Sequence, residues 1–496
     1  MIERLAFRNL LVRPWRSAFL LFGYSLGVAV MIVLLSIGEA LLSQARQEKL
    51  VGGGQVTVLP SGIDVEVLKT GGLGGMFFSI DRAHFIYRQM LAAPRLSPFV
   101  AAVAPQIEGK LLYARTLGGD EVAVLASGEI PSRTSAVDAM PLIAAGAWSD
   151  DALDREWHDP APRELRHSID HFHVPPPEAV EDPSWAEWHY FNVLSSDRTR
   201  WAFIAFMVTG EVPDGRWGGQ VLVTLHEQGG ETRRFVANLP PSRIRFSTST
   251  ADVAMGESSV TVLADGRYAV RARAIEERGS RPAEVNLVVA PTPGVYFPGA
   301  ALTTAGVVSG YVVPGLRAEA TGSICVAGAC EEYRSAQAYH DHNWGLWRGV
   351  TWEWGASRAG PYTLLYGRVQ PDTSTTAQPL FIYVTDSLGF LGLFRARDIQ
   401  YEDSRMLRVG GKRLRIPSRG LMTDIRGGDT LRVELTVEDA TAMDTRTPSG
   451  DRREGLSARE ISRPYFIQMK GRMRVSGRVS GRAIAGEGAG FFETYR

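Results

Sequence analysis

The apolar positions along the chain fall into one long uninterrupted run, a mixed segment, and a long succession of short alternating stretches. The uninterrupted run extends from Ser17 to Gly38 and carries no charged side chain. A helix of this length spans roughly 30 Å, the thickness of a bilayer core. Four arginines precede it, so the positive-inside rule predicts a cytoplasmic N-terminus and export of the chain after about residue 40.

A cleaved signal peptide is the alternative to a membrane anchor, because Ser43-Gln44-Ala45 weakly resembles a cleavage site. The apolar run is longer than the roughly 7–15 apolar residues of a signal sequence, which favours the uncleaved anchor. No other stretch of the sequence is apolar and long enough to be a second span. We therefore expect a single-pass protein of a bacterial inner membrane, with its bulk in the periplasm or another extracytoplasmic space.

Short alternating stretches follow one another from residue 185 to the end of the chain, which is typical of β-barrels or sandwiches. Asp265-Gly266 separates two such stretches and predicts a hairpin turn. About 310 residues are too many for one small barrel, so the pattern predicts a mainly β fold with two barrels. One face of the strand after the turn is predicted to carry Tyr268, Val270, Ala272 and Ala274.

The chain is therefore divided into five parts. Residues 1–45 form the basic stub and the anchor, 46–148 a small α+β segment, and 149–184 a polar, proline-rich linker. Residues 185–307 are expected to form the first barrel and 308–496 the second. Within the α+β segment, residues 53–62, 99–115 and 121–131 are predicted as strands and 79–93 as a helix.

The composition argues against one class of function, nucleic-acid binding. The 54 basic and 54 acidic side chains cancel, and no basic block is present, which argues against nucleic-acid binding. The two cysteines, Cys325 and Cys330, flank a short turn and could form a disulfide across a hairpin if this part of the chain lies outside the cytoplasm. Two reduced cysteines in a hairpin are the alternative. A zinc site is not expected from them, since no second cysteine pair exists.

Residues 339–345, Tyr-His-Asp-His-Asn-Trp-Gly, hold the most unusual group of polar side chains. On a strand, His340, His342 and Trp344 would share one face, and the opposite face would carry Tyr339, Asp341 and Asn343. Three interpretations remain open: an acid–base or polar-ligand site in an apolar barrel, a polar cluster that braces strands, and a metal site. Metal binding is the least favoured, because no further ligands are identified at a useful spacing.

A second His-x-His pair, His171 and His173, lies in the linker, but no partner ligand can be named for it from the sequence. We therefore expect neither a metal nor a cofactor. Aromatic residues gather after the motif, and Trp352 and Trp354 share one face of a predicted strand. They form either a core layer or the wall of a cavity for a long apolar molecule.

Three stretches carry a resemblance to a known family. They are EWHYFNVL at 187–194, the long stretch at 310–345 that ends in the histidine motif, and GEGAGFFETYR at 486–496. Together they resemble the AttH/CrtC family of double lipocalin-like proteins, which includes carotenoid 1,2-hydratases. His189 stands where the family opening has a second tryptophan. The resemblance implies two calycin-like barrels, with a hydrophobic ligand between or inside them.

In hydratase-like members the implied reaction needs no cofactor: protonation of a terminal C=C bond gives a tertiary carbocation, which water captures. The resemblance assigns His342 and Trp344 to matched catalytic positions, with Asp341 as a proton donor or orienting group. Tyr366 is the nearest counterpart of a family tyrosine, although Arg368 follows where the family has a carboxylate. The expected ligand-binding residues are Tyr339, His340, Asn343, Trp347, Trp352, Trp354, Trp188 and Tyr190.

Residues 5–41 resemble the first membrane helix of MacB/FtsX-type ABC transporter permeases, and 46–148 would be a shortened form of their extracytoplasmic core. The chain lacks the other membrane helices and a Gly-x4-Gly-Lys-[Ser/Thr] loop, so it is neither a complete permease nor the ATPase. The resemblance implies association with ABC transporter subunits.

We expect a membrane-anchored protein that binds an isoprenoid or lipid for such a transporter. The alternatives are a cofactor-independent hydratase, isomerase or cyclase acting on such a molecule, and a purely structural docking protein.

Overall fold

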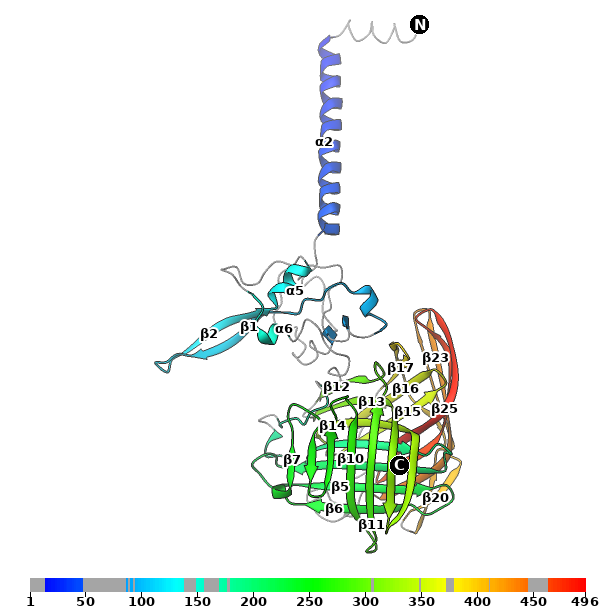
Figure 1. Cartoon of the computed structure of the whole chain (residues 1–496). Helices are drawn as coiled ribbons and strands as arrows, with labels where there is room; N and C mark the ends of the chain where they lie inside the picture. The colour runs from blue at the N-terminus through cyan, green and yellow to red at the C-terminus, as the bar shows by residue number, and fades with distance from the viewer. Residues whose placement is uncertain are drawn as a thin grey trace. The chain divides into compact units, whose positions relative to one another are not determined.

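The computed structural model divides the chain into two compact units, Met1–Phe78 with Ala102–Asp154, and Ser79–Ala101 with Arg155–Arg496 (Figure 1). The described residues are 14–47, 86–87, 90–91, 94–137, 149–155, 169–175, 179–304, 307–347, 349–371, 379–409, 411–444 and 463–496.

The first unit begins with the long helix α2 (Pro14–Gln47). Its segment Pro14–Ile37 is apolar and long enough to cross a membrane, and none of it is buried in the protein. A signal sequence near an N-terminus has the same properties, so the helix is consistent with a membrane anchor and with a signal sequence. Exposed leucine, isoleucine and phenylalanine side chains over several turns are costly in water and favourable in lipid.

The rest of the first unit contains the antiparallel hairpin of β1 (Gln106–Arg115) and β2 (Glu121–Glu129), followed by α5 (Pro131–Ala136) and α6 (Ala152–Arg155). The strands expected in 99–115 and 121–131 are thus present. The strand expected at 53–62 lies outside the described residues.

The helix expected at 79–93 is described only at 86–87 and 90–91, which are helical and belong to the second unit. A short 3-10 helix, Ser97–Phe99, follows there.

The first sheet of the second unit has twelve strands. Its central strands run in the order β11-β13-β14-β3-β4-β5-β6-β10, and β10 also pairs with β11, so these strands close into a barrel. The strands are β3 (Trp185–Leu194), β4 (Arg200–Gly210), β5 (Trp217–Glu227), β6 (Arg233–Leu239), β7 (Ile244–Phe246), β8 (Val253–Met255), β9 (Ser258–Val262), β10 (Tyr268–Glu276), β11 (Pro282–Pro291), β12 (Phe297–Thr304), β13 (Val307–Val326) and β14 (Ala329–Leu346).

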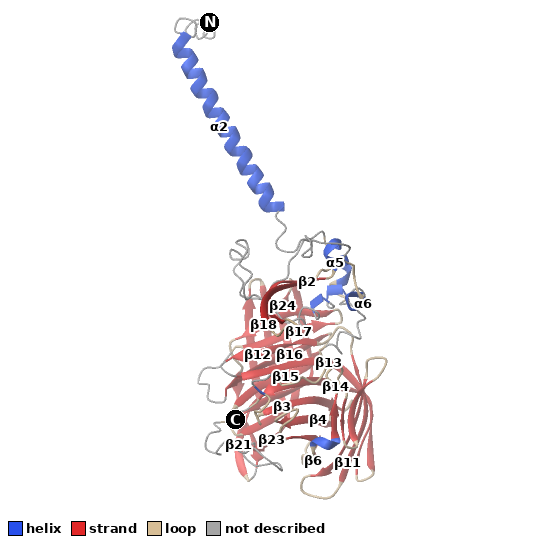
Figure 2. Cartoon of the chain, turned by 90° about the vertical axis from the view of Figure 1, so that its left-hand side faces the viewer, coloured by secondary structure: helices blue, strands red, loops and turns tan. Residues whose placement is uncertain are grey.

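The second sheet has nine strands in the order β18-β17-β16-β15-β25-β24-β23-β22-β19 and is strongly curled (Figure 2). A separate hairpin joins β20 (Arg405–Val409) and β21 (Lys412–Ile416). The strands are β15 (Val350–Ala359), β16 (Tyr362–Pro371), β17 (Leu380–Asp386), β18 (Gly389–Ala396), β19 (Gln400–Glu402), β22 (Arg419–Arg426), β23 (Asp429–Asp444), β24 (Tyr465–Val479) and β25 (Arg482–Tyr495).

Alternation along the strands builds the two cores. The predicted inward face of β10 is at most 2% exposed at each of its four residues, and it faces a core that includes Phe191, Phe206 and Phe235. The predicted turn at Asp265-Gly266 joins β9 to β10, and Gly266 has the positive φ that favours glycine. The fold class predicted from the sequence, mainly β after one N-terminal helix, is confirmed.

Two parts of the predicted domain division differ from the structure. The division placed 308–346 in the second barrel, whereas β13 and β14 pair with β11 and β3 in the first sheet, so the change of sheet lies between β14 and β15. The expected linker is also more than a spacer, because Phe172 is buried in the first core. Both differences have the same cause: strand pairing and burial depend on contacts that are distant in sequence.

Candidate functional site

The histidine motif lies on β14, beside β3 in the wall of the first barrel. The two strands are antiparallel, with His342 opposite His189 and Asp341 opposite Tyr190. Side chains alternate between the two faces of this wall. The inner face carries Glu187, His189, His340, His342 and Trp344, and the outer face carries Trp188, Tyr190, Tyr339, Asp341 and Asn343.

On the inner face, the carboxylate of Asp170 accepts hydrogen bonds from several elements. His340 Nε2 lies 3.0 Å from Asp170 Oδ2, and His342 Nδ1 lies 2.9 Å from Oδ1. The Tyr268 hydroxyl donates to Oδ2 over 2.7 Å. All four side chains are fully or almost fully buried. Residue 170 belongs to the expected linker, so this segment is held inside the barrel by polar contacts as well as by Phe172.

Glu187 is the second carboxylate of this inner cluster. Its Oε1 lies 2.8 Å from His342 Nε2 and 3.0 Å from His173 Nδ1, and it accepts a bond from the His173 backbone N–H. Burial disfavours a charged imidazole, but the hydrogen bonds to Asp170 and Glu187 outweigh it and raise the pKa of His342 to about 9. The ring of His173 also stacks on Trp344 at a centroid distance of 3.6 Å.

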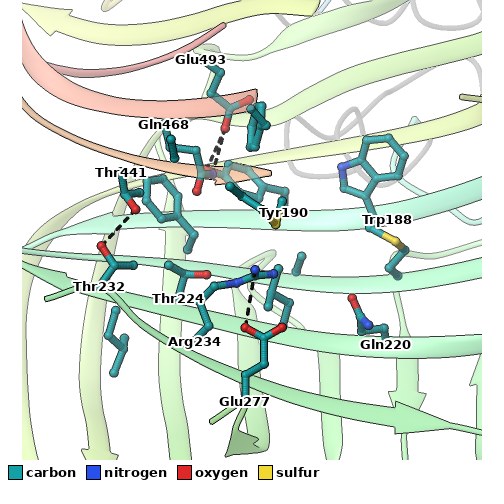
Figure 3. A pocket seen from close by; sticks show the side chains of 18 of the residues that line it. Trp188, Tyr190, Gln220, Thr224, Thr232, Arg234, Glu277, Thr441, Gln468 and Glu493 are labelled. Atoms are coloured by element: carbon teal, nitrogen blue, oxygen red, sulfur yellow. Dashed lines mark hydrogen bonds and ion pairs between the residues drawn. The ribbon is translucent and has the colours of Figure 1, made fainter. Parts of the chain in front are cut away.

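The outer face of the wall lines an open cleft between the two sheets, with a volume of about 3390 Å³. Strands β3 to β6 form one side, and β15 with β23 to β25 contributes to the other. Figure 3 shows Trp188 and Tyr190 on the first side and Gln468 and Glu493 on the second. The predicted site residues that line the cleft are Asp341, Asn343, Trp347, Trp352, Trp354, Trp188 and Tyr190.

Asp341 is the carboxyl group of the motif that reaches this cleft. Tyr339 Oη donates to its Oδ2 over 2.8 Å, Asn343 Nδ2 donates to its Oδ1 over 2.7 Å, and Trp354 Nε1 in turn donates to the Tyr339 hydroxyl over 2.8 Å. Burial raises the pKa of Asp341 to about 8, against the opposing effect of the Tyr339 hydrogen bond. The carboxyl is therefore held in one orientation by two direct neighbours, and Trp354 in turn fixes Tyr339.

Glu493 is a second carboxyl in the cleft, contributed by β25. Trp352 Nε1 donates to its Oε2 over 3.0 Å, while Tyr190 Oη and Gln468 Nε2 each lie 3.3 Å from Oε1. Burial raises the pKa of Glu493 above its usual value, although these three hydrogen bonds oppose the shift. Since Tyr190 lies opposite Asp341 in the strand register, the two carboxyls flank the same tyrosine.

The other predicted site residues lie away from the cleft lining. His340, His342 and Trp344 point to the inner face, since the pleat turns every second side chain to that side. Tyr339 packs between the sheets and contacts the cleft lining through its bonds to Asp341 and Trp354. Tyr366 is fully buried in the core of the second sheet.

Arg368 pairs with Glu353 at 2.9 Å and Asp398 at 2.8 Å. At the position where the resemblance implied a carboxylate, this chain therefore has a buried arginine that pairs with the buried Glu353 and the half-exposed Asp398.

Five side chains of the inner cluster and the cleft were not among the predicted site residues. Part of the signal was available: strand alternation puts Glu187 and His189 on one face of β3, and Asp170 precedes the linker histidines. No local pattern, however, connects these residues to β14 or β25. The missed residues are Asp170, His173, Glu187, His189 and Glu493.

Of the two alternatives for the cysteine pair, a disulfide or two reduced thiols, the structure contains the disulfide. Cys325 and Cys330 face each other in the β13–β14 register and are joined by a disulfide. The bond closes the tip of the hairpin whose other end carries the histidine motif.

No protein-family model matches the chain, and no curated protein matches it. Among solved structures, a protein provisionally assigned as AttH from Nitrosomonas europaea is 16% identical, with a TM-score of 0.43, over 66% of this chain and 98% of that one. CghA bound to Sch210972 is 15% identical, with a TM-score of 0.40, over 66% and 94%. Kievitone hydratase from Nectria haematococca is 12% identical, with a TM-score of 0.37, over the same shares.

Proposed function

We propose that the chain binds a hydrophobic molecule of the isoprenoid or lipid class in the cleft between its two sheets. The observation that carries this proposal is the convergence of tryptophans from both sheets on one open cleft: Trp188 from β3, and Trp352 and Trp354 from β15. Indole rings offer large apolar contact area at a low cost in side-chain entropy. An open cleft of this size suits a long molecule better than a compact one.

The polar groups of the cleft give such a ligand an orientation. Asp341 and Glu493 lie at its aromatic end, and the neighbouring hydrogen bonds hold both carboxyls in place. A hydroxyl or other polar end group of the ligand would pair with them, while the apolar chain lies along the tryptophans. Specificity in apolar pockets generally comes from a few fixed polar groups of this kind.

Acid-catalysed hydration is a second candidate, favoured by the buried carboxyl of Glu493 beside the Trp352 indole. The Glu493 carboxylic acid would give its proton to the less substituted carbon of a terminal C=C bond, leaving a tertiary carbocation at the other carbon, next to the indole, whose face stabilises positive charge. The oxygen of a water molecule then bonds to the cationic carbon. The carboxylate takes the proton that this water loses, so the product is a tertiary alcohol and the acid is restored.

One experiment tests both candidates. The full chain, purified in detergent, is titrated with geranylgeraniol or oleic acid, and binding is followed by tryptophan fluorescence. We expect saturable binding to at least one probe, and Trp188→Ala to weaken it about tenfold through lost aromatic contact. Phe390→Ala removes an exposed aromatic residue outside the cleft and serves as the control.

The same mixtures, prepared in 18O-labelled water, are then analysed for a labelled alcohol formed from geranylgeraniol. Label that is lost in Glu493→Gln while binding is kept supports hydration. Binding without label supports a carrier alone, and no saturable binding to either probe, or equal binding by Trp188→Ala, contradicts the proposed function.

A further inference from the structure

We propose that the inner cluster of the first barrel is a binding site for one divalent transition-metal ion, held by Asp170, His189, His340 and His342. Sequence reasoning set metal binding aside because the motif supplied only two histidines. The structure brings the remaining donors from β3 and from the segment 169–175.

The donor atoms surround one point in the core. Three imidazole nitrogens lie around the Asp170 carboxylate: His340 Nε2 at 3.0 Å, His342 Nδ1 at 2.9 Å and His189 Nδ1 at 3.5 Å. Donor atoms of Asp170, His189 and His340 all lie within 4.8 Å of one another. The rings of His189 and His342 are 4.1 Å apart. Three imidazoles and one carboxylate form a donor set that suits tetrahedral Zn²⁺ and related ions.

The groups behind these donors have the arrangement of an outer ligand shell. A metal-bound histidine commonly uses its second ring nitrogen to donate to a carbonyl or carboxylate. His340 Nδ1 lies 3.1 Å from the Tyr190 carbonyl, and His342 Nε2 lies 2.8 Å from Glu187. In each case the other nitrogen points to Asp170, so a metal ion there would bind that nitrogen while the Tyr190 carbonyl or Glu187 accepts the remaining N–H. The Tyr268 hydroxyl orients Asp170 in the same way.

His189 is an independent indication of a missing partner. Its side chain is fully buried, and neither ring nitrogen makes a hydrogen bond, although the backbone of Ala251 and Asp170 Oδ1 lie nearby. A buried imidazole without a partner costs about 1–3 kcal/mol. Coordination of Nδ1 to a metal ion would satisfy this side chain more fully than its 3.5 Å contact with Asp170 Oδ1 does.

The charges of the buried carboxylates also favour a divalent ion in this cluster. Asp170 and Glu187 are both buried, and two carboxylates in a low-dielectric core need two positive charges. One divalent ion with three neutral imidazoles supplies them in full. The rival arrangement, a protonated His342 that bridges both carboxylates, supplies one charge and leaves His189 without a partner.

The place of the site in the fold indicates its role. The ligands face the core of the first barrel, on the opposite side of the β3–β14 wall from the cleft. All four ligands are fully buried. We therefore expect an ion that fastens the segment 169–175 to the wall and keeps β14 in register, without contacting a molecule in the cleft.

The test uses the full chain, purified in detergent without chelators, polyhistidine tag or metal-affinity column. Metal content per chain is measured by plasma mass spectrometry, and any shortfall is then titrated with Zn²⁺ or Co²⁺. We expect a total of about one equivalent, a tetrahedral Co²⁺ absorption spectrum, and a higher Tm in the loaded protein. His189→Gln should lower the bound metal at least fivefold.

His226→Gln is the matched control, because His226 is also buried and bonded to a carboxylate, Asp439, at 2.8 Å, but lies outside the cluster. It should keep the full equivalent. Wild-type chain that contains less than about a tenth of an equivalent and takes up neither ion would overturn the proposal, as would equal metal binding by His189→Gln. If His189→Gln does not fold, the wild-type metal content and Co²⁺ spectrum still decide.

Discussion

At the scale of single residues, the chain places several carboxyls and imidazoles where water cannot reach them. Their ionisation then depends on the hydrogen bonds that each side chain makes. Asp170 and Glu187 are surrounded by imidazoles, and the pKa of each stays below its usual value despite burial. Glu493 has only neutral donors around it, and the pKa of its carboxyl rises. The inner cluster thus suits a cation, and the cleft suits an uncharged acid.

Glu493 gives a pH prediction whose sign follows from this shift. Its folded pKa lies above the 4.5 usual for a glutamate, so between the two values the folded state binds more protons than the unfolded state. Stability is therefore lost as pH rises through that window, by about 1.4 kcal/mol per pH unit at most. The glutamine of Glu493→Gln does not ionise. The unfolding free energy of this variant should therefore increase relative to that of wild type as pH rises from about 5 to about 7.

Urea unfolding of both proteins at the two pH values measures this difference. Titrating groups that do not interact with Glu493 affect both proteins equally and cancel in the comparison. Both proteins are therefore also compared in an Asp341→Asn background, because the charge of Glu493 raises the pKa of Asp341. A difference that stays constant with pH would show that Glu493 titrates as an ordinary exposed carboxyl.

At the scale of elements, β14 shows how a strand can serve two sites. The alternation predicted for 339–344 is present: the histidines face the barrel core, and Asp341 and Asn343 face the cleft. A shift of one residue in the pairing of β14 with β3 would exchange the two sets. The β13–β14 pairing is long, and the disulfide closes its far end.

We expect the disulfide to hold the tip of this hairpin rather than the whole barrel. It closes a loop of few residues, so its removal should cost about 2 kcal/mol, mainly in local opening. In Cys325→Ser/Cys330→Ser, amide hydrogen exchange should speed up at 323–332, whereas residues 339–345 should exchange as in wild type. Equal acceleration at both ends of β14 would contradict a local role.

At the scale of the whole molecule, the second unit joins two curled sheets that each bury an apolar core. Part of their contact is filled by Tyr311, Leu316, Trp354 and Phe491. The remainder stays open as the cleft. A site between sheets can change its lining without disturbing either core. This separation is a physical reason why one fold can host several functions.

The prediction at this scale concerns whether the N-terminal helix is a membrane anchor or a cleaved signal peptide. With α2 uncleaved, the full chain should sediment with membranes and keep the mass of the intact sequence, and residues 48–496 should be soluble. A soluble protein that begins after residue 45 would instead identify a signal peptide. Permease subunits that co-purify with the full chain but not with 48–496 would support the proposed link to an ABC transporter.

The sequence by itself determined what depends on neighbouring residues. These features are the apolar helix, the strands after residue 185, the turn at Asp265-Gly266, and the two faces of 339–344, because hydrophobic period and turn chemistry are local properties. It could not determine what faces those side chains. Asp170, Glu187 and His189 reach His340 and His342, and Glu493 reaches Tyr190, only through tertiary contacts across more than a hundred residues. The tertiary structure alone decided that the histidines lie in a closed core with Asp170 and Glu187, and that Asp341 and Glu493 lie in an open cleft, because barrel closure selects which face of each strand is buried.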